Sequence, residues 1–220
     1  MRPTSTRHHG RFRFIPAEGL TAIAIMGLLT FSGCASYGPA PPVVVSAPTS
    51  EGAGSVAARG FVPLSVLPTT TPADMADVGT LYHQDGSYSQ LVPRDPVAPA
   101  LDTILVKELR KAGYDPVLLP APAPKDAPTL SLKVTVFQDN VRQSLVEAKQ
   151  TARIAFQATL VIHDGRTTRT MTRTISRHLS PKPVVSFDPG TLSALMGELF
   201  AKSLREDLIP SIKAKTGASQ

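Results

Sequence analysis

Apolar residues recur along this chain with two different spacings, and the change of spacing separates helices from strands. Between Asp95 and Gly113 they follow the three-to-four spacing of an amphipathic helix. The stripe consists of Val97, Leu101, Ile104, Leu105 and Leu109. Gly113 suits a left-handed cap and Pro116 prevents continuation. The pattern predicts a helix over residues 95–112.

A second helix is predicted near the C-terminus, over residues 190–209. Its apolar stripe consists of Leu192, Leu195, Met196, Leu199, Phe200, Leu204 and Leu208. Pro210 is expected to end it, because proline lacks the N–H group that a helix interior needs. We expect both helices to pack on the same face of a sheet through these stripes.

Elsewhere apolar and polar residues alternate strictly, which is the pattern of strands with one buried face. The alternation covers residues 130–136 and residues 154–162. Asp164-Gly165 follows, a strong signal for a two-residue hairpin turn, so we expect His163 to pair with Arg166. The threonine-rich stretch after the turn is predicted as the return strand, with one polar face toward solvent.

The folded part begins with a short apolar run, residues 61–67, predicted as a first strand in which Pro63 indicates an edge or a bulge. Residues 68–93 show no helical stripe and are predicted as a long loop with a short strand near 81–91. A proline-rich connector covers 119–124. These elements predict an α+β fold: a two-layer arrangement of a mainly antiparallel sheet with two amphipathic helices on one face.

The N-terminal part carries a targeting signal. Several arginines precede an apolar run from Gly19 to Phe31, and small residues then lead to Cys34, the one cysteine of the chain. This resembles the signal of bacterial lipoproteins, whose cysteine thiol takes diacylglycerol and whose amine then takes a further acyl chain. Such multiple acylation anchors a protein effectively permanently. The alternative is a plain signal peptide or a single transmembrane anchor, although the run is short for a span of about 20 residues.

The chain is therefore predicted to have four parts. Residues 1–33 are the signal peptide; residues 34–58 are the lipidated Cys34 and a flexible tether rich in Pro, Ala and Ser; residues 59–215 are a periplasmic α+β domain; and residues 216–220 are a disordered tail. An alternative for part of the tether is a strand at Pro42–Val45 added to a sheet edge. Ala35 stands where Asp commonly signals inner-membrane retention, which favours the outer membrane.

Charge and cysteine content limit the classes of partner and of chemistry that fit this chain. The mature chain carries a net charge of +3, because four Arg and one Glu leave with the signal peptide. Without a Lys/Arg block, this balance argues against a nucleic-acid partner. Acylation of Cys34 leaves no thiol for a disulfide, a nucleophile or a metal. The expected partners are the membrane, through the lipid anchor, and envelope proteins such as a transporter or an assembly complex.

No known catalytic or phosphate-binding motif occurs, so we predict no catalytic residue, no metal and no cofactor. The alternative is an envelope hydrolase or metal-dependent enzyme whose site lies in the loop 68–93. Its candidate residues are His83, Asp85 and Ser87, with Ser89 as a further hydroxyl. Solvated loop residues are the simpler interpretation.

Arg169, Arg173 and Arg177 share one face of the return strand, together with Met171 and Ile175. Guanidinium groups in a row can bind phosphate or carboxylate, so these arginines are a candidate partner-binding surface. They are equally explained as protection of an edge strand, with their aliphatic stems covering the sheet.

Several segments together resemble small bacterial envelope lipoproteins of the YajG type. They are Val78-Gly79, the helix from Leu101 to Gly113-Tyr114, the hairpin at Asp164-Gly165 and the late helix Leu192–Leu208. These lipoproteins belong with a wider group that has a TolB-N-terminal-like or LptE-like core and includes auxiliary lipoproteins of lipid-transport ABC systems. The resemblance implies an accessory role through protein partners and no catalytic residues. YajG-type chains have an acidic-x-Arg element where this one has Leu67-Pro68-Thr69-Thr70.

Overall fold

The computed structural model describes residues 42–45, 61–72, 75, 77–121, 126–144, 147–184 and 189–217, with the side chains of 180–193 left out. All of these residues belong to one compact unit, Pro39–Gln220. The predicted signal peptide, Cys34 and most of the predicted tether lie outside the described residues.

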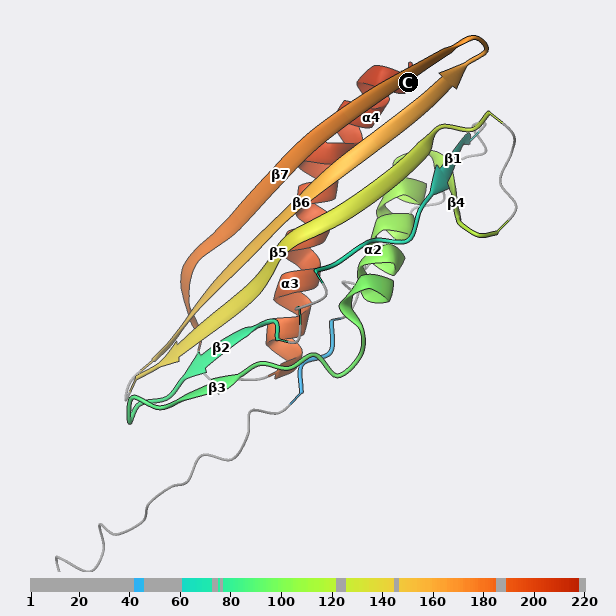
Figure 1. Cartoon of the computed structure of the whole chain (residues 1–220). Helices are drawn as coiled ribbons and strands as arrows, with labels where there is room; N and C mark the ends of the chain where they lie inside the picture. The colour runs from blue at the N-terminus through green and yellow to red at the C-terminus, as the bar shows by residue number, and fades with distance from the viewer. Residues whose placement is uncertain are drawn as a thin grey trace, which may run out of the picture. The chain divides into compact units, whose positions relative to one another are not determined.

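One sheet and two helical segments make up the described part (Figure 1). In chain order the elements are β1 (Val62–Val66), β2 (Gly79–Tyr82), β3 (Tyr88–Gln90), α2 (Val97–Lys111), β4 (Tyr114–Leu118), β5 (Thr129–Gln143), β6 (Ala148–Asp164), β7 (Thr167–Val184), α3 (Pro189–Ser203), the π-helical η2 (Leu204–Leu208) and α4 (Ile209–Thr216).

The long strand β5 organises the sheet. One of its edges pairs antiparallel with β6, which pairs antiparallel with β7. Its other edge pairs in parallel with β1 at Thr129–Leu130 and with β2 at Asp139–Arg142. β4 then joins β1 in parallel, and β3 joins β2 antiparallel. The α+β class is confirmed, but the sheet is mixed rather than mainly antiparallel.

β1 and β4 pair in parallel because the chain between them passes through α2. Parallel neighbours need such a crossover, and a helix usually supplies it. Pro63 fits the same topology. Alternate β1 residues donate to β5, as Ser65 N–H does to the Pro128 carbonyl at 2.8 Å. Pro63 points to that side before β5 begins, so its missing N–H breaks no ladder bond.

Both helical segments cover one face of the sheet, and the strands lie in front of them in Figure 1. α2 packs on β4 and α3, and α3 packs on β6 and β7. Among the described side chains the predicted stripes are buried, apart from the partly buried Leu195, and Leu101, Leu105 and Leu204 are fully buried. The rings of Phe156 and Phe200 meet edge to face at 5.4 Å, an arrangement worth about 0.5–1.5 kcal/mol beyond area burial. The prediction of one shared face is confirmed.

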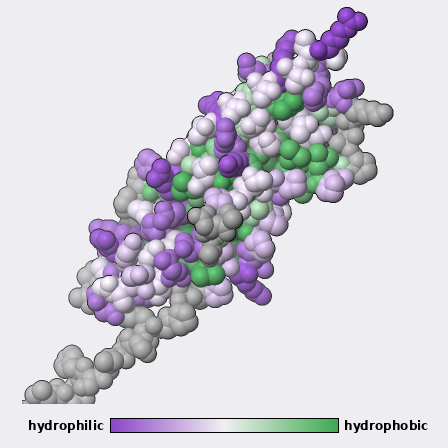
Figure 2. All heavy atoms as spheres, in the orientation of Figure 1, coloured by the Kyte–Doolittle hydropathy of each residue, from purple (hydrophilic) through white to green (hydrophobic). Residues whose placement is uncertain are grey.

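The other face of the sheet is open, and on β7 it is lined by exposed threonines: Thr168, Thr170, Thr172 and Thr174. Figure 2 shows this face as largely hydrophilic, with hydrophobic atoms gathered toward β1 and β4 and again beside β3. The expectation that the return strand turns a polar face to solvent is therefore confirmed.

The hairpin between β6 and β7 has a different register from the predicted one. Asp164 pairs with Thr167 and His163 with Thr168, so the turn residues are Gly165 and Arg166. Gly165 has a φ of 56°, and glycine at the first central position is the preference of a type II′ turn. The Asp-Gly signal located the hairpin correctly, but Asp164 belongs to the strand. The shift is two residues, so each side chain keeps the predicted face.

β4 is not predicted by the sequence, in which Pro116 indicates only the end of the preceding helix. Val62 N–H donates to the Gly113 carbonyl at 3.2 Å, and Leu119 N–H donates to the Val66 carbonyl at 2.8 Å. The odd-numbered backbone groups of β4 therefore face β1, and Pro116 turns its missing N–H away from the ladder. Proline is tolerated at such an edge position and blunts it against further strands.

The C-terminal helix does not end at Pro210, as the sequence predicted. A π-helical turn, Leu204–Leu208, lies directly before it, and α4 continues to Thr216 and Gly217. The wider turn removes the clash that a proline ring makes with the preceding turn of an α-helix. The Tyr114 hydroxyl lies 3.2 Å from the Thr216 hydroxyl, so the added turns reach the start of β4. Residues 218–220 lie outside the described part.

At the N-terminal side, Val43 is fixed to the folded domain. It forms a parallel bridge with Pro93, its N–H donates to the Val92 carbonyl at 2.9 Å, and its carbonyl accepts from Arg94 at 2.8 Å. Val43 is only 2% exposed. This is the contact that the alternative at Pro42–Val45 anticipated, as a single bridge rather than a strand. Among the described residues, no helix is long and apolar enough to cross a bilayer.

Candidate functional site: the groove between α2 and β4

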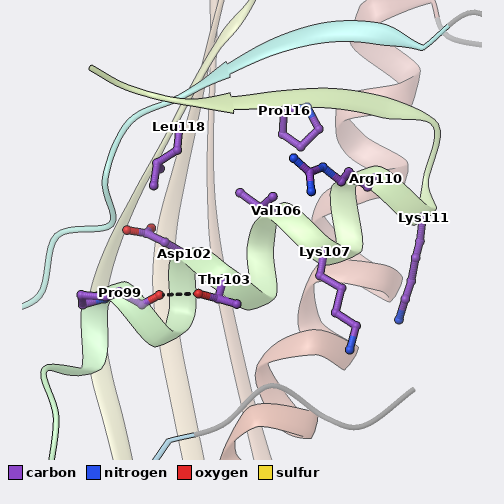
Figure 3. A pocket seen from close by; sticks show the side chains of 9 residues that line it. All are labelled: Pro99, Asp102, Thr103, Val106, Lys107, Arg110, Lys111, Pro116 and Leu118. Carbon is purple, nitrogen blue, oxygen red and sulfur yellow. Dashed lines mark hydrogen bonds between the residues drawn. The ribbon is translucent and has the colours of Figure 1, made fainter. Parts of the chain in front are cut away.

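A groove of about 830 Å³ lies between the outer side of α2 and the edge strand β4. Its lining is mostly apolar. The residues are Pro99, Asp102, Thr103, Val106, Lys107, Arg110, Lys111, Pro116 and Leu118. Figure 3 shows Val106 pointing toward β4 and Arg110 beneath Pro116, while Lys107 and Lys111 extend away from the strand. The volume and the mainly apolar surface of the lining are typical of binding pockets.

Two buried carboxylates hold α2 in place beside this groove. Asp102 is 7% exposed and accepts a 2.9 Å hydrogen bond from the Thr69 N–H, which ties the helix to the chain leaving β1. The Glu108 side chain is 1% exposed and lies 2.8 Å from Lys111 Nζ and 3.6 Å from the Arg205 guanidinium. Glu108 thus offsets the charge of Lys111, while Lys107 and Arg110 add positive charge to the lining.

The groove does not offer a free strand edge. The outward backbone position at its centre is Pro116, which has no N–H to donate, so an added strand would lose a bond there. Leu118 is 37% exposed and lies with Val106 on the apolar part. A bound molecule would therefore be held chiefly by apolar side-chain contacts and by the nearby cations.

The three predicted arginines of β7 lie on the face that packs against the helices. Arg177 contacts Asp207 at 2.6 Å and Glu206 at 2.7 Å, and the hydrogen bond that it donates to Asp207 raises the pKa of its guanidinium. Arg173 donates to the Ser211 hydroxyl. Arg169 lies 3.5 Å from Asp164, with both side chains exposed. Arg177 and Arg173 therefore attach η2 and α4 to the sheet, and they would have to leave these contacts to bind a partner.

The loop residues proposed for the enzymatic alternative fall into two separate pairs. His83 Nε2 lies 2.8 Å from the Ser89 hydroxyl, and His83 is 7% exposed. Asp85 instead accepts from the backbone and the hydroxyl of Ser87, at 2.9 and 2.6 Å, and these bonds lower the pKa of Asp85. The carboxylate is thus directed to Ser87 rather than to the histidine. Other residues line the α2–β4 groove and two smaller hollows over the sheet.

Sequence reasoning did not find one buried acid on β5. Asp139 is 2% exposed and accepts a 2.7 Å hydrogen bond from Gln150 Nε2, while its second oxygen has no hydrogen-bond partner among the described residues. Burial raises the pKa of Asp139 to about 7. Within the described residues, no three His, Cys, Asp or Glu side chains cluster in a way that could hold a metal ion.

Asp139 makes the stability of the fold depend on pH. Its pKa is about 7 when folded against a reference value of 3.8, so the folded state binds the extra proton between these values. Stability should therefore fall as the pH rises toward 7 and level off above it, by about 3 kcal/mol between about pH 5 and 8 at about 1.4 kcal/mol per pKa unit. Urea titrations at several pH values would measure this. Asp139→Asn should flatten the profile; an unchanged profile would show that another group titrates.

The similarity of this chain to known proteins lies in its fold. No family model matches this chain, and no curated protein matches it. A Xanthomonas campestris protein of the family DUF330 is 13% identical over 82% of this chain and 100% of its own, with a TM-score of 0.50. An uncharacterized protein is 18% identical over 71% and 93% (TM-score 0.48), and a Neisseria meningitidis lipoprotein is 10% identical over 71% and 98% (TM-score 0.27). The chain thus has an architecture similar to that of the X. campestris protein.

Proposed function

We propose that this protein is a lipid-anchored accessory module of the bacterial cell envelope that binds protein partners and carries out no chemistry of its own. The observation that carries the proposal is the cysteine signal at Cys34, placed after an apolar run and followed by a separately folded α+β domain. Membership of the YajG type, assistance to transport or assembly, and an outer-membrane location facing the periplasm are the finer parts of this proposal.

The anchor is tested by changing the cysteine. Wild-type protein should fractionate with membranes and incorporate an alkynyl fatty acid, because the Cys34 thiol is the acceptor. Cys34→Ser should incorporate no label and leave the membrane fraction after lysis. A serine variant that is still labelled, or that stays in the membrane fraction as fully as the wild type, would contradict the proposal.

Partner binding is assigned to the α2–β4 groove. Its apolar lining and its cations, Lys107, Arg110 and Lys111, fit a segment of an envelope protein that presents apolar side chains flanked by acidic ones. Such charges at the rim of an interface chiefly speed association and add salt sensitivity. A second candidate surface, predicted from the sequence, consists of Arg169, Arg173 and Arg177. Binding there would require Arg173 and Arg177 to leave their contacts with η2 and α4.

A photoreactive residue tests the groove directly. Val106 is half-buried and outside the core, so a photo-crosslinking amino acid there should leave the fold intact and capture the partner in cells. The matched control is Thr172, which is exposed on the open face of the sheet. The crosslinked partner peptide should contain apolar residues next to Asp or Glu. Equal capture from both positions, or a captured peptide without these features, would contradict the assignment.

The enzymatic alternative rests on the His83–Ser89 hydrogen bond of 2.8 Å. A serine nucleophile needs its histidine oriented by a third group, and Asp85 is directed to Ser87 instead. A serine-reactive activity probe separates the two functions, since the binding module should remain unlabelled. Labelling that disappears in Ser89→Ala would favour the enzyme.

A further inference from the structure

We propose that the end of the domain carrying β2 and β3 lies against the bilayer, with Tyr82 and Tyr88 at the membrane interface. This inference rests on the proposed anchoring at Cys34 and adds an orientation to it. It is built from two separate observations: the attachment of the chain to the domain at Val43, and the side chains that are exposed on β2, β3 and their neighbours.

The first observation is the short connection. Val43 is bridged to Pro93 and 2% exposed, so the chain is already part of the domain there. The nine residue steps from Cys34 to Val43 can span at most about 30 Å, at about 3.3–3.6 Å per residue. The predicted tether to residue 58 is therefore not the length that separates the domain from its anchor. β6 alone, with 17 residues, measures about 55 Å at about 3.3 Å per residue.

The second observation is a row of exposed side chains across four strands beside the β2–β3 turn, about five residues along the chain from Pro93. The register places Tyr88 of β3 opposite Tyr82 of β2, Tyr82 beside Arg142 of β5, and Arg142 opposite Lys149 of β6. Tyr88 is 66% exposed and Tyr82 is 39% exposed. The Arg142 guanidinium lies 5.6 Å from the centre of the Tyr82 ring. We call these four residues the tyrosine–cation row.

Two aliphatic side chains extend this surface beside the attachment point. Val44 is 39% exposed and Val92 is 49% exposed, and each is next to or bonded to Val43. Figure 2 shows hydrophobic atoms reaching the surface beside β3, in agreement with these values. Exposed tyrosine and valine next to long cationic side chains match the chemistry of a membrane interface, where aromatic rings sit at the headgroup level and Lys and Arg reach the phosphates.

Acidic groups near the tyrosine–cation row determine whether membrane contact requires anionic lipids. Asp85 lies in the β2–β3 turn, bonded to Ser87, and Glu147 lies 2.9 Å from Lys149. They offset part of the positive charge of the row. Contact should therefore depend on the aromatic and aliphatic side chains and should occur on zwitterionic phosphatidylcholine.

The chain contains no tryptophan, so one introduced indole reports on one position. We would place it at Tyr88 (Tyr88→Trp) and, as a matched control, at Phe61 (Phe61→Trp). Phe61 is 48% exposed and precedes β1, which meets the opposite end of β5 from β2. Lipidated full-length protein would be reconstituted into phosphatidylcholine vesicles whose acyl chains carry bromine near the ester, since bromine quenches only nearby indoles.

Tyr88→Trp should lose about half of its emission in brominated vesicles, because the ring sits at interfacial depth, while Phe61→Trp should keep its emission. Protein that floats with the vesicles but shows neither indole quenched would overturn the orientation and leave the anchor standing. Equal quenching of both would also overturn it. Protein whose mass shows no acyl chain would refute the proposed function, and this inference with it.

Discussion

Gly79→Ala should destabilise the domain by about 2–5 kcal/mol, the sum of backbone strain and overpacking. Gly79 has a φ of 150°, and a Cβ atom on it would overlap the backbone carbonyl of Asp139. The two backbones approach closely because Asp139 N–H donates to the Val78 carbonyl at 2.7 Å, and on the other side of β2 Leu91 N–H donates to the Gly79 carbonyl at 2.9 Å. An alanine at position 79 must push β2 away from β5 and disrupt this close contact between the two strands.

The measurement is the free energy of unfolding from urea titration, with Gly86→Ala as the matched control. Gly86 also has a positive φ, of 85°, but open space surrounds it. Its substitution should cost only the backbone strain, about 1 kcal/mol. Equal losses for the two variants would mean that the close approach of β2 to β5 does not exist.

The second large effect is expected where the helices meet the sheet. Phe200→Ala should cost about 3–5 kcal/mol and Leu105→Ala about 2–5 kcal/mol, because each leaves a cavity in a packed core. Both side chains are fully buried, Phe200 against the Phe156 ring. The control on α2 is Arg110→Ala, an exposed position where the change should stay within about 0.5 kcal/mol. An unchanged denaturation midpoint for Leu105→Ala would mean that the face of α2 is misassigned.

The helices and the central hairpin could be predicted because their signals are local. The stripe from Val97 to Leu109 has one solution, an amphipathic helix, and Gly113 adopts a φ of 92° just after it, as its cap role requires. Alternation in β5 and β6 likewise fixes which face is buried. Register is less local: Asp164-Gly165 marks a turn, but which of its residues belongs to the strand depends on the turn type.

The parallel strands could not be predicted, since their pairing joins residues far apart in the chain. β4 is five residues long and contains Pro116, so its composition suggests a loop until β1 is seen beside it. The α2–β4 groove depends on that strand and was missed for the same reason. The role of the β7 arginines was hidden too, because their contacts join residues 30 and 38 positions apart in the chain. Arg177 contacts Asp207 inside the predicted helix, and Arg173 contacts Ser211, which lies beyond the predicted end at Pro210.

The central claim is that Cys34 becomes the acylated first residue of the mature protein. Intact-mass and N-terminal peptide analysis of protein extracted from membranes tests it most directly. We predict a chain that begins at Cys34, with its mass raised by diacylglycerol and one further acyl chain. A mature chain that begins at another residue, or one with an unmodified Cys34, would contradict the account.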